Sequence, residues 1–266
     1  MPGSSERKNT NLQHQEGTQL TDMHNLLNDK VVLITGASKG IGKALAIGFA
    51  MAGASVSCAA RTKELLGLTV GEIHTKGGKA LAVAVDVTKE SEVQQMLQDT
   101  VEHFGGLDIL VINAGGNPEQ RPVADSDPDK WRETIELNLI GAYYCAKTAI
   151  PYLKKRGRGK IITMGSGQGH KGLAGFSAYA CSKAGLWMLT RTLAQELQQE
   201  NISVNELIPG PVDTGSVSET FRKNVIEKQH EWLKRPEDVV QLALFLASQP
   251  DFGPTAQSYS LMRRDN

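Results

Sequence analysis

Tyr179, Lys183 and Ser166 are the residues of this 266-residue chain whose types and spacing suggest chemistry. In a helix over residues 176–200, Tyr179 and Lys183 would lie one turn apart on the same face. A neighbouring ammonium group favours the ionised form of a phenol, so the phenol can exchange a proton near neutral pH. A hydroxyl such as that of Ser166 could hydrogen-bond an oxygen whose charge changes during a reaction. By itself, a Tyr and a Lys at this spacing are more often a solvated surface pair, so the rest of the sequence must decide.

Residues 35–42, Thr-Gly-Ala-Ser-Lys-Gly-Ile-Gly, form a second candidate site. They follow the apolar run 31–34, which is typical of a strand buried on both faces, and precede a helical stretch over 43–52. Glycines let the backbone approach an anion, and a helix N-terminus offers free N–H groups. The spacing differs from the usual Gly-x-Gly-x-x-Gly fingerprint, but the strand–turn–helix setting indicates a phosphate site.

Strand-like and helical segments alternate along the chain. Apolar strands are expected at 31–34, 55–60, 80–85, 107–112, 160–164 and 202–208, and further helices at 62–76, 89–104, 128–136, 138–155 and 176–200. This alternation predicts an α/β fold, a single Rossmann-type doubly wound parallel sheet of about seven strands with helices on both faces. Such a sheet binds ligands beyond the carboxyl ends of its strands. The residues that follow strands should therefore share one edge, namely Gly36, Arg61, Asp86, Asn113, Ser166 and Pro209.

Composition and charge argue against several classes of protein. The chain has 29 basic and 29 acidic residues, and this balance does not favour binding to nucleic acid or to a membrane surface. No stretch approaches the roughly 20 apolar residues that span a bilayer, and the N-terminus lacks the apolar core of a signal peptide. The three cysteines have the spacing of neither a metal site nor a disulfide framework. We therefore expect a cytoplasmic protein whose partner is a small molecule, with no metal.

The chain is expected to contain one ordered domain. Residues 1–28 are polar and cannot bury enough apolar surface to offset the entropy of ordering, so they are expected to form a flexible extension. Within this extension, Leu26 and Leu27 could dock just before the first strand. Nothing in residues 29–266 marks a boundary to a second domain.

The order and spacing of these segments resemble the short-chain dehydrogenase/reductase family, in its compact 3-oxoacyl-reductase-like branch. The resemblance covers residues 29–262 and rests on the turn 35–42, Asp86-Val87, Asn113-Ala114-Gly115, Asn138, Ser166, Tyr179-x-x-x-Lys183 and Pro209-Gly210. It implies that residues 29–266 are an NAD(P)-binding catalytic domain. Such a domain transfers hydride between a nicotinamide and a ketone or secondary alcohol.

The resemblance implies a role for each catalytic candidate. Tyr179 would protonate the substrate carbonyl oxygen, or deprotonate the alcohol in the reverse direction. Lys183 would hold the nicotinamide ribose and lower the pKa of the phenol, while Ser166 would hydrogen-bond the substrate oxygen. Asn138 would hold a water in the proton path to Lys183, although a buried Asn that interrupts a helix is the simpler interpretation. The cofactor would be bound by Gly36, Ser38, Lys39, Gly40, Ile41, Arg61, Asp86, Val87, Asn113, Ala114, Gly115, Tyr179, Lys183, Pro209, Gly210, Val212 and Thr214.

Ala60 and Arg61, at the end of the second expected strand, favour NADP(H) as the cofactor. A carboxylate at this position would accept hydrogen bonds from the adenosine 2′-hydroxyl and select NAD. A neutral residue followed by a guanidinium instead suits a 2′-phosphate. Lys39 would add a second positive charge nearby. If both bases are merely exposed to solvent, an NAD-dependent alcohol dehydrogenase stays open.

Some segments depart from the family pattern or bear on the substrate. Gly165 stands where many relatives carry a serine, and residues 253–264 lack the strand and the Asp-Gly-Gly-like tail with which relatives usually finish. Residues 212–235 are expected to form the substrate lid. Gln168 and His170 could contact substrate, although a loop histidine is more often merely solvated.

The sequence thus predicts an NADP(H)-dependent oxidoreductase with Tyr179 as its general acid and base. Two alternatives stay open, an NAD-dependent alcohol dehydrogenase and a non-catalytic, cofactor-sensing protein of the same fold. Such non-catalytic proteins commonly lose the Tyr or the Lys, whereas this chain has kept Tyr179 and Lys183. The resemblance also implies a homodimer or homotetramer that associates through the helices 138–155 and 176–200. The fold alone does not identify the substrate.

Overall fold

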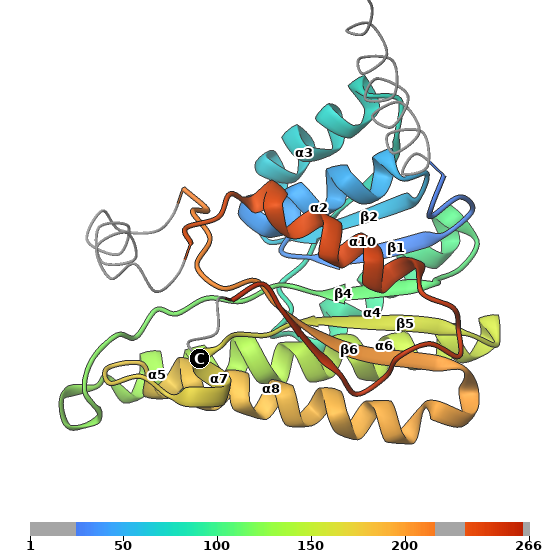
Figure 1. Ribbon diagram of the computed structural model, residues 1–266. Coiled ribbons are helices and arrows are strands. Elements are labelled where there is room, and N and C mark those ends of the chain that lie inside the picture. The colour runs from blue at the N-terminus through green and yellow to red at the C-terminus, as the bar shows by residue number, and fades with distance from the viewer. Residues whose placement is uncertain (1–24, 216–231, 263–266) are drawn as a thin grey trace, which may run out of the picture.

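A seven-stranded parallel sheet is the centre of the computed structural model, which describes residues 25–215 and 232–262 (Figure 1). The strand order is β3-β2-β1-β4-β5-β6-β7, so the winding direction reverses between β1 and β4. The strands are β1 (Val31–Thr35), β2 (Ser55–Ala60), β3 (Lys79–Ala84), β4 (Ile109–Ile112), β5 (Gly159–Met164), β6 (Ile202–Ile208) and β7 (Ser258–Ser260). This topology confirms the predicted doubly wound α/β fold.

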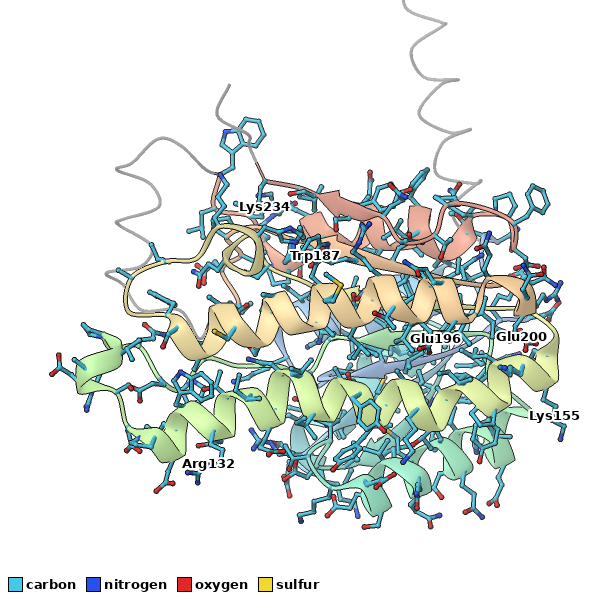
Figure 2. The ribbon with its side chains drawn as sticks, turned by 90° about the horizontal axis from the view of Figure 1, so that it is seen from below. Arg132, Lys155, Trp187, Glu196, Glu200 and Lys234 are labelled. Atoms are coloured by element: carbon cyan, nitrogen blue, oxygen red, sulfur yellow. The ribbon has the colours of Figure 1, made fainter. Side chains whose placement is uncertain are left out.

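Helices cover both faces of the sheet. One face carries α2 (Gly40–Met51), α3 (Lys63–Thr75) and α10 (Val240–Ser248). The other face, towards which Figure 2 looks, carries α4 (Glu90–Phe104), α6 (Gly141–Arg156) and α8 (Ser177–Glu196). The shorter elements are α5 (Pro128–Ile135), a π-helical turn (Glu136–Ile140), α7 (Gln168–Lys171) and the 3₁₀ turns Val123–Asp125, Gln198–Glu200 and Pro236–Val239.

The apolar strands explain why the sheet has a helical layer on each side. Successive side chains of a strand point to opposite faces. In β1, Val32 and Ile34 pack into the core beneath α2, α3 and α10, whereas Leu33 packs into the core beneath α4, α6 and α8. All five residues of β1 are buried, as are all four of β4. A strand buried on both faces is held firmly, so the position of its carboxyl end is well defined.

The prediction that the chain lacks the terminal strand of its relatives was wrong. Residues 258–260 form β7, which pairs in parallel with β6. The side chain of Asn205 secures the preceding turn, because its Nδ2 donates to the carbonyl of Pro254 (2.7 Å) and its Oδ1 accepts from the N–H of Gln257 (3.1 Å). The sequence Ser-Tyr-Ser offers no apolar run, so the strand depends on long-range contacts that local pattern does not reveal.

The chain is held to the domain just before β1. Leu27 is buried, and its N–H donates to the carbonyl of Ala52 (2.9 Å), which confirms that it docks before β1. Residues 1–24 of the expected extension and residues 216–231 of the expected lid lie outside the described residues. Within 25–215 and 232–262, no helix has both the length and the apolar character needed to cross a bilayer.

The packing of the glycine-rich turn against α2 makes a prediction about stability. A Cβ at Gly42 would collide with the carbonyl oxygen of Gly36 and lie 2.5 Å from Asn113 Nδ2. We expect Gly42→Ala to lower the free energy of unfolding by about 1–3 kcal/mol, because the added methyl group forces the backbone apart. Equilibrium unfolding in urea measures the change. Gly67→Ala is the matched control, since no atom of the described residues beyond its chain neighbours and the backbone of α3 lies within 4 Å of its Cβ position, and alanine there should stabilise by about 0.5–1 kcal/mol. Equal stability of wild type and Gly42→Ala would contradict the argument.

Candidate active site

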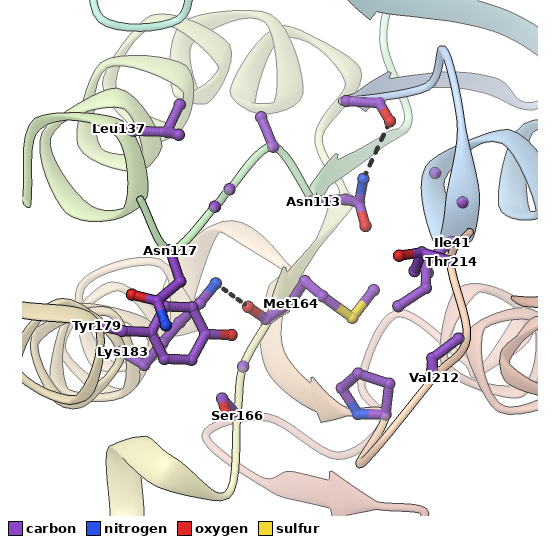
Figure 3. A pocket seen from close by; sticks show the side chains of 18 of the residues that line it. Ile41, Asn113, Asn117, Leu137, Met164, Ser166, Tyr179, Lys183, Val212 and Thr214 are labelled. Carbon is purple, nitrogen blue, oxygen red and sulfur yellow. Dashed lines mark hydrogen bonds between the residues drawn. The ribbon is translucent and has the colours of Figure 1, made fainter. Parts of the chain in front are cut away.

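A cavity of about 960 Å³ lies beyond the carboxyl ends of the strands (Figure 3). Its wall contains all six residues that were expected to meet at this edge, and all seventeen residues that were expected to bind the cofactor. The topology brings them together because every strand of a parallel sheet ends on the same side. A volume of this size is at the upper end of the range typical of ligand sites.

The glycine-rich turn is locked to the end of β4. Thr35 Oγ1 accepts hydrogen bonds from the N–H groups of Asn113 and Ala114, both at 3.0 Å. Asn113 Nδ2 in return donates to the carbonyl of Thr35 (2.9 Å). Gly36 and Gly40 adopt φ values of +71° and +54°, which disfavour any side chain. The ends of β1 and β4 are thus fixed at the point where the winding reverses.

The start of α2 has the properties of an anion site. Lys39 occupies the N-cap position without a side-chain capping hydrogen bond to the first turn, so the side chain does not occupy the first N–H groups of α2. A Cβ on Gly36 would lie 2.8 Å from Asn113 Nδ2, and one on Gly40 would lie 3.0 Å from Thr214 Cβ. Only glycine leaves room for a group to approach the backbone here. The turn therefore fits the phosphate groups of a dinucleotide.

Tyr179 and Lys183 lie on one face of α8, as the spacing predicts (Figure 3). The Lys183 Nζ lies 5.7 Å from the centre of the Tyr179 ring and donates a hydrogen bond to the carbonyl of Met164 (2.8 Å). Ser166 follows β5 and interacts with the Tyr179 side chain, while its Oγ accepts from the N–H of Gln168 (3.2 Å). A hydroxyl, a phenol and an ammonium group therefore adjoin one cavity wall.

Burial changes the pKa values of both titratable groups. It lowers the pKa of Lys183 to about 8, and the negative charge of Glu206 opposes this shift only in part. Burial raises the pKa of Tyr179, and the interaction with the Ser166 hydroxyl offsets only part of the rise. The net shift of the phenol pKa is upward because desolvation outweighs the effects of neighbouring groups, and the expected influence of Lys183 on it stays a prediction.

Asn138 interrupts the helix from α5 to α6, since it lies in the π-helical turn. Its buried side chain makes two hydrogen bonds to the backbone of Gly116. The Oδ1 atom accepts from the N–H (2.9 Å), and Nδ2 donates to the carbonyl (2.8 Å). The same Nδ2 donates to Ser182 Oγ (3.0 Å), next to Lys183. The structure thus confirms a buried Asn in an interrupted helix that ties the loop after β4 to α8. The proposed water in the proton path stays a prediction.

The two residues proposed to contact substrate differ in position. Gln168 lines the cavity, whereas His170 is not among its lining residues in the described part of the chain. Nε2 of His170 instead lies 3.0 Å from Oε2 of Glu206, and its ring packs on that of Trp187 with a centroid distance of 4.8 Å. The suggested contact of His170 with substrate is therefore not supported. The neighbouring carboxylate draws the imidazole away from the cavity.

Sequence reasoning missed several residues of the cavity wall. The missed residues include Gly116, Asn117, Gln120, Leu137, Met164, Lys171, Leu173, Phe176 and Met262. Asn117, Gln120, Leu173 and Phe176 lie in connecting segments and Lys171 ends the four-residue helix α7, so hydrophobic periodicity carries no information about them. Met262 reaches the cavity only because β7 pairs with β6. Gly116 directly follows the Asn113–Gly115 motif, so its position in the sequence was a signal that could have placed it in the cavity wall.

The reversed winding, the glycine-rich turn and the large cavity at one sheet edge define a Rossmann-type α/β protein with a site of dinucleotide size. The model of the short chain dehydrogenase family matches residues 30–225. The chain is 35% identical over 230 residues to a 7alpha-hydroxysteroid dehydrogenase of Escherichia coli K12, covering 84% of this chain and 88% of that protein.

Two further similarities agree with this match. A 3-oxoacyl-(acyl-carrier-protein) reductase of Thermotoga maritima is 35% identical over 235 residues, covering 87% of this chain and 95% of that protein. The crystal structure of a short-chain type dehydrogenase/reductase from Mycobacterium marinum is 33% identical, with a TM-score of 0.84 and coverage of 91% of this chain and 97% of that chain. The chain therefore belongs to the short-chain dehydrogenase/reductase family of oxidoreductases, which use a nicotinamide cofactor.

The lowered pKa of Lys183 predicts how stability depends on pH. Between the folded value of about 8 and the ordinary value of 10.5, the unfolded chain binds a proton that the native chain lacks. The free energy of unfolding should therefore rise with pH in this range, by at most about 1.4 kcal/mol per pH unit from this one group. We expect Lys183→Met to abolish this contribution, as measured by urea unfolding at several pH values in the range.

The two buried cysteines act in the opposite direction. Burial raises the pKa of Cys58 and of Cys145 from 9.0 to about 12, so the native chain retains protons there that the unfolded chain loses as pH rises. Because Lys183→Met keeps both cysteines, the difference in slope between wild type and variant isolates Lys183. Identical slopes would show that the ammonium group is not desolvated in the folded protein.

Proposed function

We propose that the protein is an NADP(H)-dependent oxidoreductase that interconverts a ketone and a secondary alcohol, with Tyr179 as general acid and base. The observation that carries this proposal is the convergence of Ser166, Tyr179 and Lys183 on one wall of the cavity that also contains Arg61. The activity proposed is similar to that of a 3-oxoacyl reductase. The runner-up is an NAD-dependent alcohol dehydrogenase, which needs the same three residues.

The bound cofactor supplies the hydride, which reaches the carbonyl carbon of the substrate. The Ser166 hydroxyl donates a hydrogen bond to the carbonyl oxygen and holds it beside the phenol. Tyr179 Oη delivers the proton that this oxygen takes up as the carbonyl bond becomes a single bond. At neutral pH a phenol of raised pKa is protonated, which suits proton donation in the direction of reduction.

Lys183 keeps most of its positive charge at neutral pH, because its pKa of about 8 lies above that value. This charge stabilises the phenolate that remains on Tyr179 after proton transfer. In the direction of oxidation the same charge favours ionisation of the phenol, which then accepts the proton of the alcohol. We assign to Asn138 the task of holding the Gly115–Gly116 segment against Lys183, since a Cβ on Gly115 would lie only 3.5 Å from Nζ.

The surroundings of Arg61 support NADP(H) as the cofactor. The β2 end carries Ala60 and Arg61 and thus no carboxylate that would select NAD. The carboxylate of Asp86, which follows β3, accepts hydrogen bonds at Oδ1 from the N–H and hydroxyl of Thr88. Burial alone would raise the Asp86 pKa, but the bonds from Thr88 and the charges of Arg61 and Lys89 lower it. A guanidinium at this edge suits a 2′-phosphate, and Lys39 adds positive charge.

Further residues that line the cavity bear on the substrate. They combine the apolar side chains of Leu137, Leu173, Phe176 and Met262 with the carboxamides of Asn117, Gln120 and Gln168. This mixture suits a carbonyl compound with an apolar body and a few polar groups. The two relatives described above are named for hydroxysteroid and 3-oxoacyl substrates, so a 7-oxo steroid and an acetoacetyl thioester are the first ketones to test.

We also propose that the chain acts in the cytoplasm as a homodimer or homotetramer. The face covered by α6 and α8 supports association, because Tyr143 on α6 and Met188 on α8 are exposed apolar side chains. When a second copy of the chain covers these apolar side chains, they leave contact with water, and this stabilises the assembly.

Cofactor preference is tested by titrating the protein with NADPH and NADH and following nicotinamide fluorescence. We expect NADPH to bind more tightly, and Arg61→Ala to weaken NADPH by about 10- to 100-fold, the effect of losing a charged hydrogen-bond donor. NADH binding should change little in this variant. Arg158→Ala is the matched control, since Arg158 adjoins the opposite edge of the sheet and pairs with Asp251. Equal or tighter binding of NADH would favour the NAD-dependent alternative, and binding of neither would favour a non-catalytic protein.

The role of Tyr179 is tested by Tyr179→Phe, which removes only the hydroxyl. We expect the kcat for reduction of the tested ketones to fall by about 10²- to 10⁴-fold, the usual contribution of a positioned acid or base. The Kd for NADPH should stay within about twofold, because the ring remains in place. Tyr143→Phe on the exposed face of α6 is the control and should behave as wild type. Normal turnover by Tyr179→Phe would exclude the phenol as the proton donor.

A further inference from the structure

Glu206 is a fully buried carboxylate in β6 to which the proposed reaction assigns no role. Its Oε2 accepts a hydrogen bond from Ser258 Oγ (2.5 Å) and lies 3.0 Å from His170 Nε2. The Oε1 atom lies 3.3 Å from the same nitrogen. A buried carboxylate is costly unless it is hydrogen-bonded, and both of these partners come from other elements of the fold.

Gly165 provides the space that the carboxylate occupies. A Cβ at this position would collide with the side chain of Glu206. The N–H of Gly165 donates to the carbonyl of Leu207 (2.8 Å), so the backbone after β5 stays in register with β6 and cannot move aside cheaply. The glycine that departs from the family pattern and the buried glutamate are thus complementary.

One side of Glu206 supports the segment that carries Ser166. His170 belongs to α7, and the first turn of this helix is hydrogen-bonded to Ser166. The N–H of Gln168 donates to Ser166 Oγ (3.2 Å), and the N–H of Gly169 donates to the Ser166 carbonyl (3.0 Å). A Cβ on Gly169 would lie 2.8 Å from the carbonyl carbon of Lys183, so α7 also packs directly on α8. Holding His170 therefore holds the Ser166 hydroxyl relative to Tyr179.

The imidazole of His170 is enclosed on its other side as well. Its ring packs on Trp187, which projects from α8 (Figure 2). The guanidinium of Arg191 lies over the Trp187 ring, 5.6 Å from its centre, and donates to the carbonyl of Ala256 (3.3 Å). The imidazole ring of His170 therefore lies between the carboxylate of Glu206 and the ring of Trp187, and these contacts limit its rotation.

The other side of Glu206 supports the C-terminal wall of the cavity. Ser258 begins β7, and two residues later Ser260 Oγ accepts from the N–H of Met262 (3.1 Å). Met262 lines the cavity, and a Cβ on Gly167 would collide with its sulfur. A single carboxylate therefore touches both the segment after β5 and the strand that brings Met262 to the site.

We propose that Glu206 is a positioning residue of this active site, which acts through His170 to fix α7 and Ser166 and through Ser258 to fix β7 and Met262. The inference rests on the proposed function, because it assigns Ser166 and Met262 to the substrate side of the cavity. The charge of Glu206 also opposes the loss of the proton from Lys183, since it raises the pKa that burial lowers.

The test compares Glu206→Gln, His170→Ala and the double variant with wild type. Glu206→Gln keeps the shape and an acceptor for Ser258 but removes the charge, so it is expected to fold. The substrate is whichever of the two test ketones, the 7-oxo steroid or the acetoacetyl thioester, the wild type reduces. We expect each single variant to lower the kcat for this ketone by about tenfold, while the Kd for NADPH stays within about twofold. The double variant should lose no more than the worse single variant, because both act through one contact. His170→Asn retains a donor for the carboxylate and should recover most of the kcat.

Hydrogen exchange measured by mass spectrometry gives a readout that needs no substrate. Peptides that cover residues 166–173 should exchange faster in Glu206→Gln and His170→Ala than in wild type, while peptides that cover β1 should not change. The controls are Glu200→Gln, which loses only an exposed pair with Lys154, and His103→Ala on α4. Both should match wild type in kcat and in exchange.

The outcomes separate this inference from the proposed function. Unchanged kcat and unchanged exchange over residues 166–173 in both single variants would overturn the role of Glu206. Faster exchange over these residues combined with a wild type that binds neither NADPH nor NADH would overturn the proposed function but support the positioning of α7 by Glu206. Faster exchange with unchanged kcat would show that Glu206 holds α7 for stability only, and would also overturn the inference.

Discussion

Burial of the Lys183 ammonium group is the constraint on which the active site depends. Its side chain is shielded from solvent on α8, so its charge must be balanced by groups that the fold brings to it. The carbonyl of Met164 at the end of β5 accepts its hydrogen bond, and the charge of Glu206 in β6 opposes its deprotonation. Each of these groups comes from a different element, so α8 must pack on the sheet in one register for the charge to be tolerated.

The same constraint explains the arrangement of the surrounding loops. Glycines bring backbone close to Lys183 on two sides, because Gly115 faces its Nζ and Gly169 packs against its main chain. Asn138 then fixes the first of these loops by gripping the backbone of Gly116. Glycine suits both positions, because a Cβ at Gly115 would lie 2.8 Å from Asn138 Oδ1 and one at Gly169 would lie 2.8 Å from the carbonyl carbon of Lys183. The buried ammonium group of Lys183 and the two loops therefore stabilise one another.

Gly165, Glu206 and β7 are linked by the contacts of one buried carboxylate. Gly165 leaves a space, and the carboxylate of Glu206 fills it. That carboxylate binds Ser258, so β7 persists despite its short polar sequence. Gly165 and Ser258, which lie far apart in the sequence, therefore both adjoin the buried carboxylate of Glu206. Such contacts are invisible to local pattern, because each residue taken alone is an ordinary choice for its segment.

The sequence by itself determined the order of the strands and helices and the shared edge of the sheet at which the candidate site residues meet. These features depend on strictly local signals, such as apolar runs, glycine spacing and the four-residue interval from Tyr179 to Lys183. Only the tertiary structure decided that β7 forms, that Met262 reaches the cavity and that His170 contacts Glu206 and does not line the cavity. It also decided that burial raises the pKa of Tyr179, since desolvation depends on everything packed around a group. Long-range contacts and burial are properties of the assembled fold, and no single segment of the sequence contains them.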